Sequence, residues 1–339
     1  MNSTIKCYFC CSLINKTNQE HIIPNAFGGK LKTTKALCEG CNKKLGQQID
    51  SKLAEMFKFL DVLINPKKER QKQKPIKVKA YIEDTKISLS NKNNNIDITT
   101  SHHPKITKEE DGTTKIQQSA YFTNEKKQKN FYKEHLEAIN KISKTQYSLE
   151  EIKNHSTVNH IKPLIIIKPL FELKTFVLGY LKILLSFCAE KEKLNNVSED
   201  EILKPFRETN SKHLEQYASF CDLNNLHNER LCHRIYIIGD SRSQKFFGFV
   251  ALYDSCPMIF MLNSIYQGED FFEGYCYDIL NRQKINEEKS FLRENLTLKL
   301  FQTCELYDQM EKCCSSSLGY PLGFFQQITA LNNGDLAKE

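Results

Sequence analysis

The stretch EHIIPNAFGGKLKTTKALCEGCN, residues 20–42, dictates the fold of the amino-terminal part of the chain. It begins with an adjacent acid and base, Glu20 and His21, followed by a short apolar run that is typical of a strand. The double glycine Gly28-Gly29 then indicates a tight turn. Taken alone, these residues are a polar strand end before a turn, so their function depends on what surrounds them.

Two Cys-x-x-Cys pairs frame this stretch, Cys7 with Cys10 and Cys38 with Cys41. Together they can supply four thiolates to one tetrahedral zinc ion, and the bound metal stabilises a unit of ~60 residues that has little core of its own. A redox role is disfavoured because no thioredoxin-like βαβ pattern surrounds either pair. The adjacent Cys11 leaves open whether it replaces Cys10 as a ligand.

A helix is predicted from Asn42 onward. Its apolar residues recur at steps of three and four, so they line one face: Leu45, Ile49, Leu53, Met56 and Leu60. The preceding KALC, residues 35–38, is a strand candidate. A closed zinc loop would bring Asn42, at the start of the helix, toward the strand that carries Glu20 and His21.

The order Cys-x-x-Cys, EHIIP, GG and LCEGCN resembles the HNH endonucleases of the ββα-metal fold, in their four-cysteine, zinc-bound form, over residues of about 5–55. The resemblance implies a small module whose zinc is structural, because four sulfur ligands leave no open position for chemistry. It also implies a catalytic divalent cation, Mg²⁺ or Mn²⁺, and hydrolysis of phosphodiester bonds in DNA.

By this resemblance His21 is the general base, and Glu20 and Asn42 ligate the catalytic cation. The residue types suit these tasks, since carboxylate and amide oxygens bind hard divalent cations and an imidazole can take a proton from water. One departure concerns the Asn or His that many members carry shortly before the second cysteine pair, because KTTKAL has neither. Asn25 and Asp50 are possible supporting residues.

Charge is unevenly distributed along the chain. Residues 1–79 hold sixteen Lys and Arg against six Asp and Glu, whereas the whole chain has a net charge of only +7. A basic excess beside the motif favours an anionic polymer as the partner, with a solvated basic surface as the alternative. The lysines that could hold DNA phosphates are Lys30, Lys32, Lys35, Lys43 and Lys44.

The predicted fold class is α+β, with an HNH module over residues 1–62 and two further segments. Residues 63–125 contain a basic, proline-containing break at 65–79 and polar sequence, which predict a linker and a small antiparallel β insertion or mobile loops. Residues 126–339 predict a larger α+β domain for recognition or regulation. Its expected elements are helices over 131–146, 173–188 and 287–312, a capped helix at SEDEILKPFRE, a strand at PLIIIK and a β-meander from RIYIIG, QKFFGFVALY and PMIFML.

The apolar segment at residues 169–190 carries Glu172, Lys174 and Lys182, so a buried helix is expected there and a membrane span is not. The start of the chain lacks a secretion signal pattern, and thirteen cysteines, an odd number, argue against a disulfide framework. These features predict a soluble, cytoplasmic protein without membrane partners. The cysteines from Cys188 onward are expected to be buried as small apolar residues.

The function predicted from these residues is a metal-dependent HNH endonuclease that acts on DNA. The alternative is a zinc-dependent nucleic-acid-binding protein without catalysis, which the KTTKAL departure and the basic residues 1–79 favour. Nicking of DNA that depends on Mg²⁺ and on His21 would distinguish the two.

Overall fold

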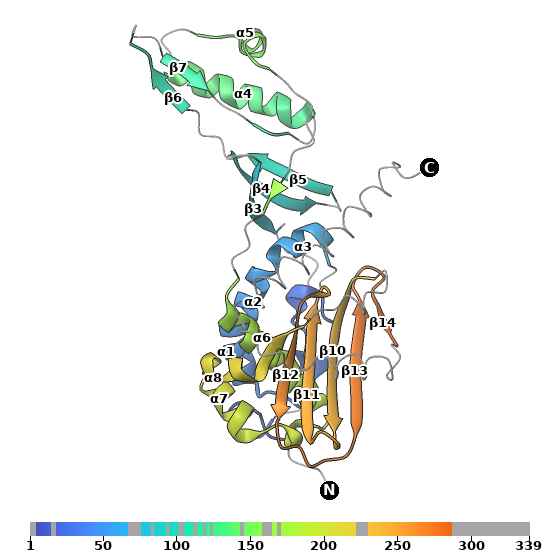
Figure 1. Cartoon of the computed structure of the whole chain (residues 1–339). Coiled ribbons are helices and arrows are strands. Elements are labelled where there is room, and N and C mark those ends of the chain that lie inside the picture. The colour runs from blue at the N-terminus through green and yellow to red at the C-terminus, as the bar shows by residue number, and fades with distance from the viewer. Residues whose placement is uncertain are drawn as a thin grey trace. The chain divides into compact units, whose positions relative to one another are not determined.

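The chain folds into helices and antiparallel sheets, which confirms the predicted α+β class. The computed structural model describes residues 5–14, 18–66, 76–82, 85–92, 95–100, 105–110, 114–117, 120–122, 125–142, 146–157, 165–167, 171–221 and 230–286. They belong to two compact units (Figure 1). The first unit combines residues 1–73 with residues 170–339, and the second spans Lys74–Pro169.

The amino-terminal module of the first unit begins with a two-stranded antiparallel hairpin, β1 (Glu20–His21) and β2 (Lys32–Thr33). Both strands are short, and Glu20 lies opposite Thr33 while His21 lies opposite Lys32. The hairpin is the ββ part of the predicted ββα module, and it places the acid and the base of the opening stretch on one strand.

The double glycine in the hairpin loop satisfies two different constraints. Gly28 ends a 3-10 turn at Asn25–Phe27 with a φ of 79°, a left-handed conformation that residues with a side chain rarely adopt. Gly29 lies so close to the chain that a Cβ atom there would be 2.0 Å from the carbonyl oxygen of Ile23. A larger residue would therefore strain the backbone at position 28 and would push the loop apart at position 29.

The helical segment after the hairpin begins at Glu39, three residues earlier than predicted. It runs through α1 (Glu39–Leu45), a π-helical turn (Gly46–Asp50), α2 (Ser51–Met56) and α3 (Lys58–Ile64). The expected strand at residues 35–38 is wrong, because the Lys35 N–H donates to Thr33 Oγ1 at 3.0 Å in a turn and Cys38 already caps α1. The predicted apolar face is confirmed, since all five of its residues are buried.

A six-stranded antiparallel sheet forms much of the remaining first unit. Its strands, in sheet order, are β14 (Gln283–Ile285), β13 (Phe271–Asp278), β10 (Cys232–Asp240), β11 (Lys245–Leu252), β12 (Ser255–Asn263) and β9 (Ala218–Phe220). Strands β10, β11 and β12 confirm the predicted β-meander (Figure 1). Nearly every residue of these three strands is buried, so both faces of the sheet are covered.

Helix α6 (Leu173–Glu190) confirms the predicted buried helix and packs against one face of the sheet. Gly248 of β11 admits the Leu184 side chain, because a Cβ atom at Gly248 would be 2.8 Å from Leu184 Cδ1. Another face of α6 meets the amino-terminal module, where Gly179 allows Leu53 of α2 an equally close approach. The helix therefore contacts both the sheet and the module.

The segment after α6 packs against the first cysteine pair. It contains 3-10 turns at Leu194–Asn196 and Glu215–Tyr217, a π-helical turn at Glu199–Leu203, α7 (Lys204–Arg207) and α8 (Ser211–Leu214). Ser198 caps the π-helical turn by accepting the N–H of Glu201, at the predicted spacing. The ring of Phe206 lies 6.1 Å from that of Tyr8, and Arg207 Nε donates to the Tyr8 carbonyl oxygen at 2.8 Å.

The division into two units does not follow the expected boundaries at residues 62 and 125. The module joins α6 and the sheet in one compact unit because α6 shares a buried interface with α2. The inserted unit is the stretch between α3 and α6. The roles expected of the three predicted segments stay predictions.

The second unit contains two separate antiparallel sheets and two helices. One sheet has the order β5 (Asn95–Thr100), β4 (Thr85–Lys92), β3 (Lys77–Ile82) and β8 (Ile165–Ile166), and the other pairs β6 (Lys105–Lys108) with β7 (Thr114–Gln117). The helices are α4 (Glu125–Ile142) and α5 (Leu149–Asn154). The predicted break at 65–79 is thus too long, because its last three residues, 77–79, form the start of β3. Further along this strand Ala80 and Ile82 are buried and Tyr81 between them is partly exposed, which is the alternation typical of a strand. The predicted strand PLIIIK is represented by β8.

Two predictions about the later chain can be compared with the described residues only in part. Cys188, Cys232, Cys256 and Cys276 are buried, as expected, whereas Cys221 is only half-buried. The helix expected over 287–312 lies outside the described residues. Within the described ranges, no helix combines the length and the apolar character that crossing a bilayer requires.

A buried histidine fastens the hairpin loop to the sheet. His233 of β10 is fully buried, and its Nδ1 accepts the N–H of Tyr253 at 3.2 Å. In the neutral ring Nε2 then carries the proton, which it donates to the carbonyl oxygen of Phe27 at 2.9 Å. Burial lowers the pKa of His233 to about 4, so the fold selects the neutral form.

We expect this histidine to make the folded state acid-sensitive. Because its folded pKa lies below the unfolded value, its contribution is complete above pH 6.5 and is lost as the pH falls toward 4, by about 3 kcal/mol in all. The free energy of unfolding, measured by denaturant titration across this range, should fall less steeply in His233→Gln than in the wild type. His155→Gln, at an exposed position, is the control and should keep the wild-type slope. Parallel pH profiles for wild type and His233→Gln would contradict this role.

Candidate functional site

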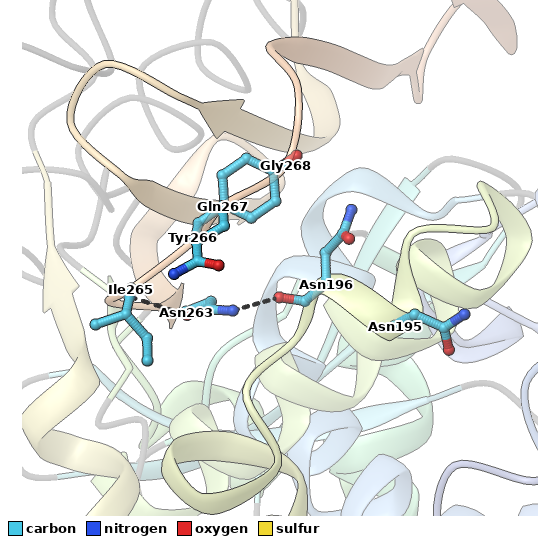
Figure 2. Close-up of a pocket in the computed structure, with 7 residues that line it drawn as sticks. All are labelled: Asn195, Asn196, Asn263, Ile265, Tyr266, Gln267 and Gly268. Atoms are coloured by element: carbon cyan, nitrogen blue, oxygen red, sulfur yellow. Dashed lines mark hydrogen bonds between the residues drawn. The ribbon is translucent and has the colours of Figure 1, made fainter.

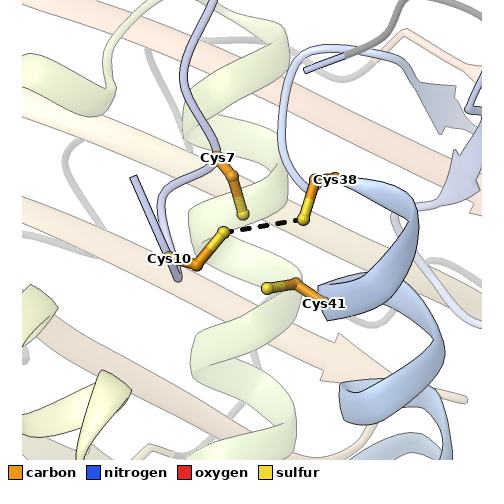
Figure 3. Close-up of side chains that lie close together, drawn as sticks. All are labelled: Cys7, Cys10, Cys38 and Cys41. Carbon is orange, nitrogen blue, oxygen red and sulfur yellow. Dashed lines mark hydrogen bonds between the residues drawn. The ribbon is translucent and has the colours of Figure 1, made fainter. Parts of the chain in front are cut away.

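The four cysteines that the sequence singles out converge on one point (Figure 3). The sulfur atoms of Cys7, Cys10, Cys38 and Cys41 all lie within 4.8 Å of one another, and those of Cys10 and Cys38 are 3.6 Å apart. Thiolates at about 2.3 Å from a tetrahedral zinc ion lie roughly 3.8 Å from each other. The cluster therefore has the size and the donor set of a four-cysteine zinc site. Among the described residues, no other cluster of His, Cys, Asp and Glu has this character.

Two kinds of local structure present the sulfur atoms. The first pair lies on a tight knuckle, in which the Cys7 N–H donates to Ser12 O at 2.8 Å and the Cys11 N–H donates to Cys7 O at 2.9 Å. The second pair lies at the start of α1, where Cys38 is the N-cap and Cys41 follows within the first turn. Cys11 has a φ of 61°, is exposed and lies outside the cluster, so Cys10 is the partner of Cys7.

The thiols of the cluster differ in acidity. Burial raises the pKa of both Cys7 and Cys41, whereas a hydrogen bond with Ser12 lowers the pKa of Cys10 to about 6. Four neighbouring thiolates repel one another, so a cation is needed for all of them to be ionised together. A divalent soft metal such as zinc supplies that charge, and these residues fit it.

The candidate catalytic residues lie on the elements that carry or adjoin the second cysteine pair. Glu20 on β1 is only 3% exposed, and His21 beside it is half-buried. Asn42 is half-buried in the first turn of α1, directly after Cys41, and its backbone N–H donates to Cys38 O at 2.9 Å. A metal at the cysteines would thus hold the turn that carries Asn42.

A chain of hydroxyl groups holds the Glu20 carboxylate from inside the protein. Ser186 of α6 donates to Glu20 Oε1 at 2.6 Å, and Tyr8 Oη lies 3.3 Å from Ser186 Oγ. Because the Ser186 hydroxyl donates its proton to Glu20, the Tyr8 hydroxyl must donate its own proton to Ser186 Oγ. The second carboxylate oxygen, Oε2, is buried and makes no hydrogen bond with the described residues.

A buried ion pair lies next to this chain. Lys182, one turn before Ser186 on α6, is 2% exposed, and its Nζ is 2.5 Å from Asp50 Oδ2. Burial raises the pKa of Glu20, and the charge of Lys182 together with the Ser186 hydrogen bond opposes that rise. Asp50, a predicted supporting residue, therefore contacts Lys182, and its negative charge adds to the rise in the Glu20 pKa.

Sequence reasoning missed Tyr8, Lys182 and Ser186 as members of this site. One signal was present, because Lys182 stands in the middle of a helix that is otherwise almost entirely apolar. A buried lysine requires a carboxylate partner nearby. Nothing in the sequence indicates which carboxylate that is, or that Ser186 reaches Glu20 across 166 positions of chain.

The five lysines predicted to contact phosphates have different surroundings. Lys35 Nζ forms an ion pair with Glu192 at 2.7 Å, and Lys44 Nζ lies 5.3 Å from the centre of the Phe9 ring. Lys43 is exposed, and Lys30 and Lys32 are half-buried. Lys35 and Lys44 thus also make contacts within the protein.

A shallow pocket elsewhere in the first unit is lined mainly by amide side chains (Figure 2). Its lining residues are Asn195, Asn196, Asn263, Ile265, Tyr266, Gln267 and Gly268, and its volume is about 350 Å³. The Asn263 side chain donates to the Asn196 carbonyl oxygen at 2.9 Å. None of the predicted site residues lines this pocket, so it is separate from the candidate nuclease residues.

A two-stranded hairpin and a helix, closed by four cysteines and bearing Glu-His on the first strand, define the class of zinc-stabilised ββα-metal modules. Comparison with known families agrees, since residues 7–58 match the sequence model of the HNH endonuclease family. The predicted resemblance over residues 5–55 is thus confirmed. No curated protein and no solved structure matches the chain.

We expect the purified protein to contain about one zinc ion per chain, held by the four clustered thiolates. Cys38→Ser should lower the zinc content and the unfolding temperature, because metal binding contributes directly to the folding of so small a module. Cys11→Ser, next to the knuckle but outside the cluster, is the matched control and should keep both. Elemental analysis with thermal unfolding measures this, and zinc loss in both variants alike would refute the assigned ligand set.

Proposed function

We propose that this protein is a metal-dependent endonuclease that hydrolyses phosphodiester bonds in DNA. The observation that carries the proposal is Glu20 Oε2, which is buried and makes no hydrogen bond with any residue that the structure describes, next to His21 in a module that matches the HNH endonuclease family. A buried carboxylate oxygen without a hydrogen bond is costly unless a ligand or a proton satisfies it. A divalent cation is the ligand that suits both the oxygen and the family.

Glu20 and Asn42 would hold this cation, Mg²⁺ or Mn²⁺, through a carboxylate and an amide oxygen. Both are hard oxygen donors, which these ions prefer over sulfur and nitrogen. When bound, the cation supplies Lewis-acid stabilisation of the charge that develops on the phosphate and on the leaving 3′ oxygen. The four cysteines would leave a bound zinc ion no open position for chemistry, and their task would be to fix the start of α1, which carries Cys38 and Cys41.

His21 would act as the general base. Its imidazole takes a proton from the water that attacks phosphorus, a role for which a ring with a pKa ordinarily near neutrality is suited. It stands on β1 directly after Glu20, so the two residues are carried by the same short strand. Phosphates on either side of the cleaved bond would contact Lys30, Lys32, Lys35, Lys43 and Lys44.

The four thiolates of the zinc site suit a reducing compartment, so we place the protein in the cytoplasm. We also propose different roles for the two parts of the chain. The HNH module would carry the chemistry, and the chain beyond it would recognise or regulate the substrate.

A zinc-dependent nucleic-acid-binding protein without catalysis is the second candidate. The observation that favours it is Lys182, whose buried ammonium group already counters carboxylate charge around Glu20 and Asp50. Under this alternative the wild type would bind DNA without nicking it. Asn42→Ala would then leave DNA binding unchanged.

Nicking of supercoiled plasmid by the wild type should require Mg²⁺ or Mn²⁺ and should fall by about 10²–10⁴-fold in His21→Ala, the usual range for loss of a general base. His155→Ala, at an exposed position of the second unit, is the control and should cleave at the wild-type rate. Gel assays of initial rate across a range of pH and metal concentrations measure this. Equal cleavage by wild type and His21→Ala would remove His21 from the mechanism.

Lys43 offers a clean test of phosphate contact, because it is exposed on α1 one residue after Asn42. Lys43→Ala should weaken DNA binding and reduce the slope of log K against log salt by about one, while the zinc content stays constant. Lys212→Ala, an exposed lysine on α8, serves as the control. Fluorescence anisotropy at several salt concentrations gives both slopes, and identical slopes for wild type and Lys43→Ala would argue against the contact.

A further inference from the structure

Helix α6 presents three successive positions of one face to the amino-terminal module. Gly179, Lys182 and Ser186 are spaced three and four residues apart, so they lie on the same side of the helix. Each meets a different part of the module: Gly179 approaches Leu53, Lys182 pairs with Asp50, and Ser186 donates to Glu20. Ser186, a residue far outside the 7–58 match, thus contacts the proposed metal ligand Glu20.

These contacts restrict the Glu20 carboxylate to one orientation. Oε1 is tied to Ser186 at 2.6 Å, and Ser186 is itself held by the Tyr8 hydroxyl at 3.3 Å. With Oε1 occupied, Oε2 is the oxygen that remains for an external ligand, and it is buried without a hydrogen bond to the described residues. Hydrogen bonds of this kind orient metal-ligating carboxylates, and their removal costs about 10–100-fold in metal affinity.

Lys182 sets the charge around the same carboxylate. Its ammonium group is 2% exposed and is bound by Asp50 Oδ2 at 2.5 Å, so it cannot turn to solvent. One positive charge against the two carboxylates of Glu20 and Asp50 leaves a net negative charge in a buried place. A divalent cation is attracted there, whereas the lysine reduces the repulsion between the buried Glu20 carboxylate and the half-buried Asp50 carboxylate.

We propose that α6 completes the nuclease site, with Ser186 and Lys182 as positioning residues that hold Glu20 so that Oε2 is left for the catalytic cation. This inference rests on the proposed function, because it assigns Glu20 to the metal. It makes the nuclease site a composite of the HNH module and the later part of the chain.

The test compares metal binding and metal-dependent nicking in the full-length, zinc-loaded protein. Ser186→Ala should weaken Mn²⁺ binding, measured by isothermal titration calorimetry, by about tenfold. The Mg²⁺ concentration for half-maximal nicking should rise by a similar factor, with the rate largely recovered at saturating Mg²⁺. Ser186→Thr, which restores the hydroxyl, should bring both values back toward those of the wild type.

Thr175→Val is the matched control. Thr175 lies on the same helix, is 5% exposed and donates its hydroxyl to a carboxylate, Glu172 Oε2, at 2.5 Å. Its removal should leave Mn²⁺ binding unchanged. In a Glu20→Ala background, Ser186→Ala should cause no further loss, because the serine acts through Glu20.

The outcomes separate the inference from the proposed function. Unchanged Mn²⁺ affinity in Ser186→Ala, in a wild type that nicks DNA, overturns the role of α6 and leaves the nuclease standing. Weakened affinity without nicking by any form supports the role of α6 and overturns the nuclease. Absence of Mn²⁺ binding by the wild type overturns both. If Ser186→Ala loses zinc or its cooperative unfolding, Ser186→Cys, of similar volume but a weaker donor, takes its place with the same expectation.

Discussion

A helix that is buried on every side has to be covered on every side, and that constraint on α6 organises the first unit. Apart from Lys174, the residues from Leu173 to Ala189 are all buried. One sheet can cover only one face of a helix, so a second surface has to cover the rest. The ββα module provides surface of this kind, since α2 meets α6 at Gly179. The module in turn is too small to form a sufficient core, so α6 stabilises it from one side, and a metal ion at the four cysteines would stabilise it from another.

What could be predicted from the sequence was local and chemically specific. The cysteine spacing indicated the metal cluster because two Cys-x-x-Cys knuckles suit one tetrahedral ion, and the steps of three and four from Leu45 to Leu60 indicated a buried helical face. The contacts of Ser186, Lys182 and Glu192 were not predictable, because they join residues far apart in the chain. The boundary expected at residue 62 failed to match the compact units for the same reason, since hydrophobic periodicity describes an element and not its partner.

The hairpin loop shows how a fold can restrain a strand of two residues. β1 and β2 form a very short ladder, and such a hairpin is marginal alone. Its loop is held at Phe27. The carbonyl oxygen of Phe27 accepts a hydrogen bond from the buried His233, and the centre of its ring lies 5.7 Å from the centre of the Phe57 ring. The Gly28-Gly29 turn then brings the chain back against Ile23. Glu20 and His21 are therefore placed by contacts at both ends of a strand that could not place them by itself.

Charge explains how Lys182 and a divalent cation could both neutralise the carboxylates of Glu20 and Asp50. Lys182 binds Asp50 Oδ2 directly, so this pair is nearly neutral, and such a pair is tolerated in the interior when its geometry is good, although Asp50 Oδ1 also makes no hydrogen bond with the described residues. Glu20 lies beside it, with Oε1 bound by Ser186 and Oε2 without a hydrogen bond from the part of the chain that the structure describes, and burial raises its pKa. A buried carboxylate in this state either keeps a proton or takes a cation. A lysine bound to Glu20 would neutralise its charge, so that neither a proton nor a metal ion would be needed. The Ser186 hydroxyl, in contrast, binds only Oε1 and leaves Oε2 available. Asp50 is thus neutralised by a lysine, whereas Glu20 has only a hydroxyl donor on Oε1, and its charge is left to be balanced by a proton or a cation.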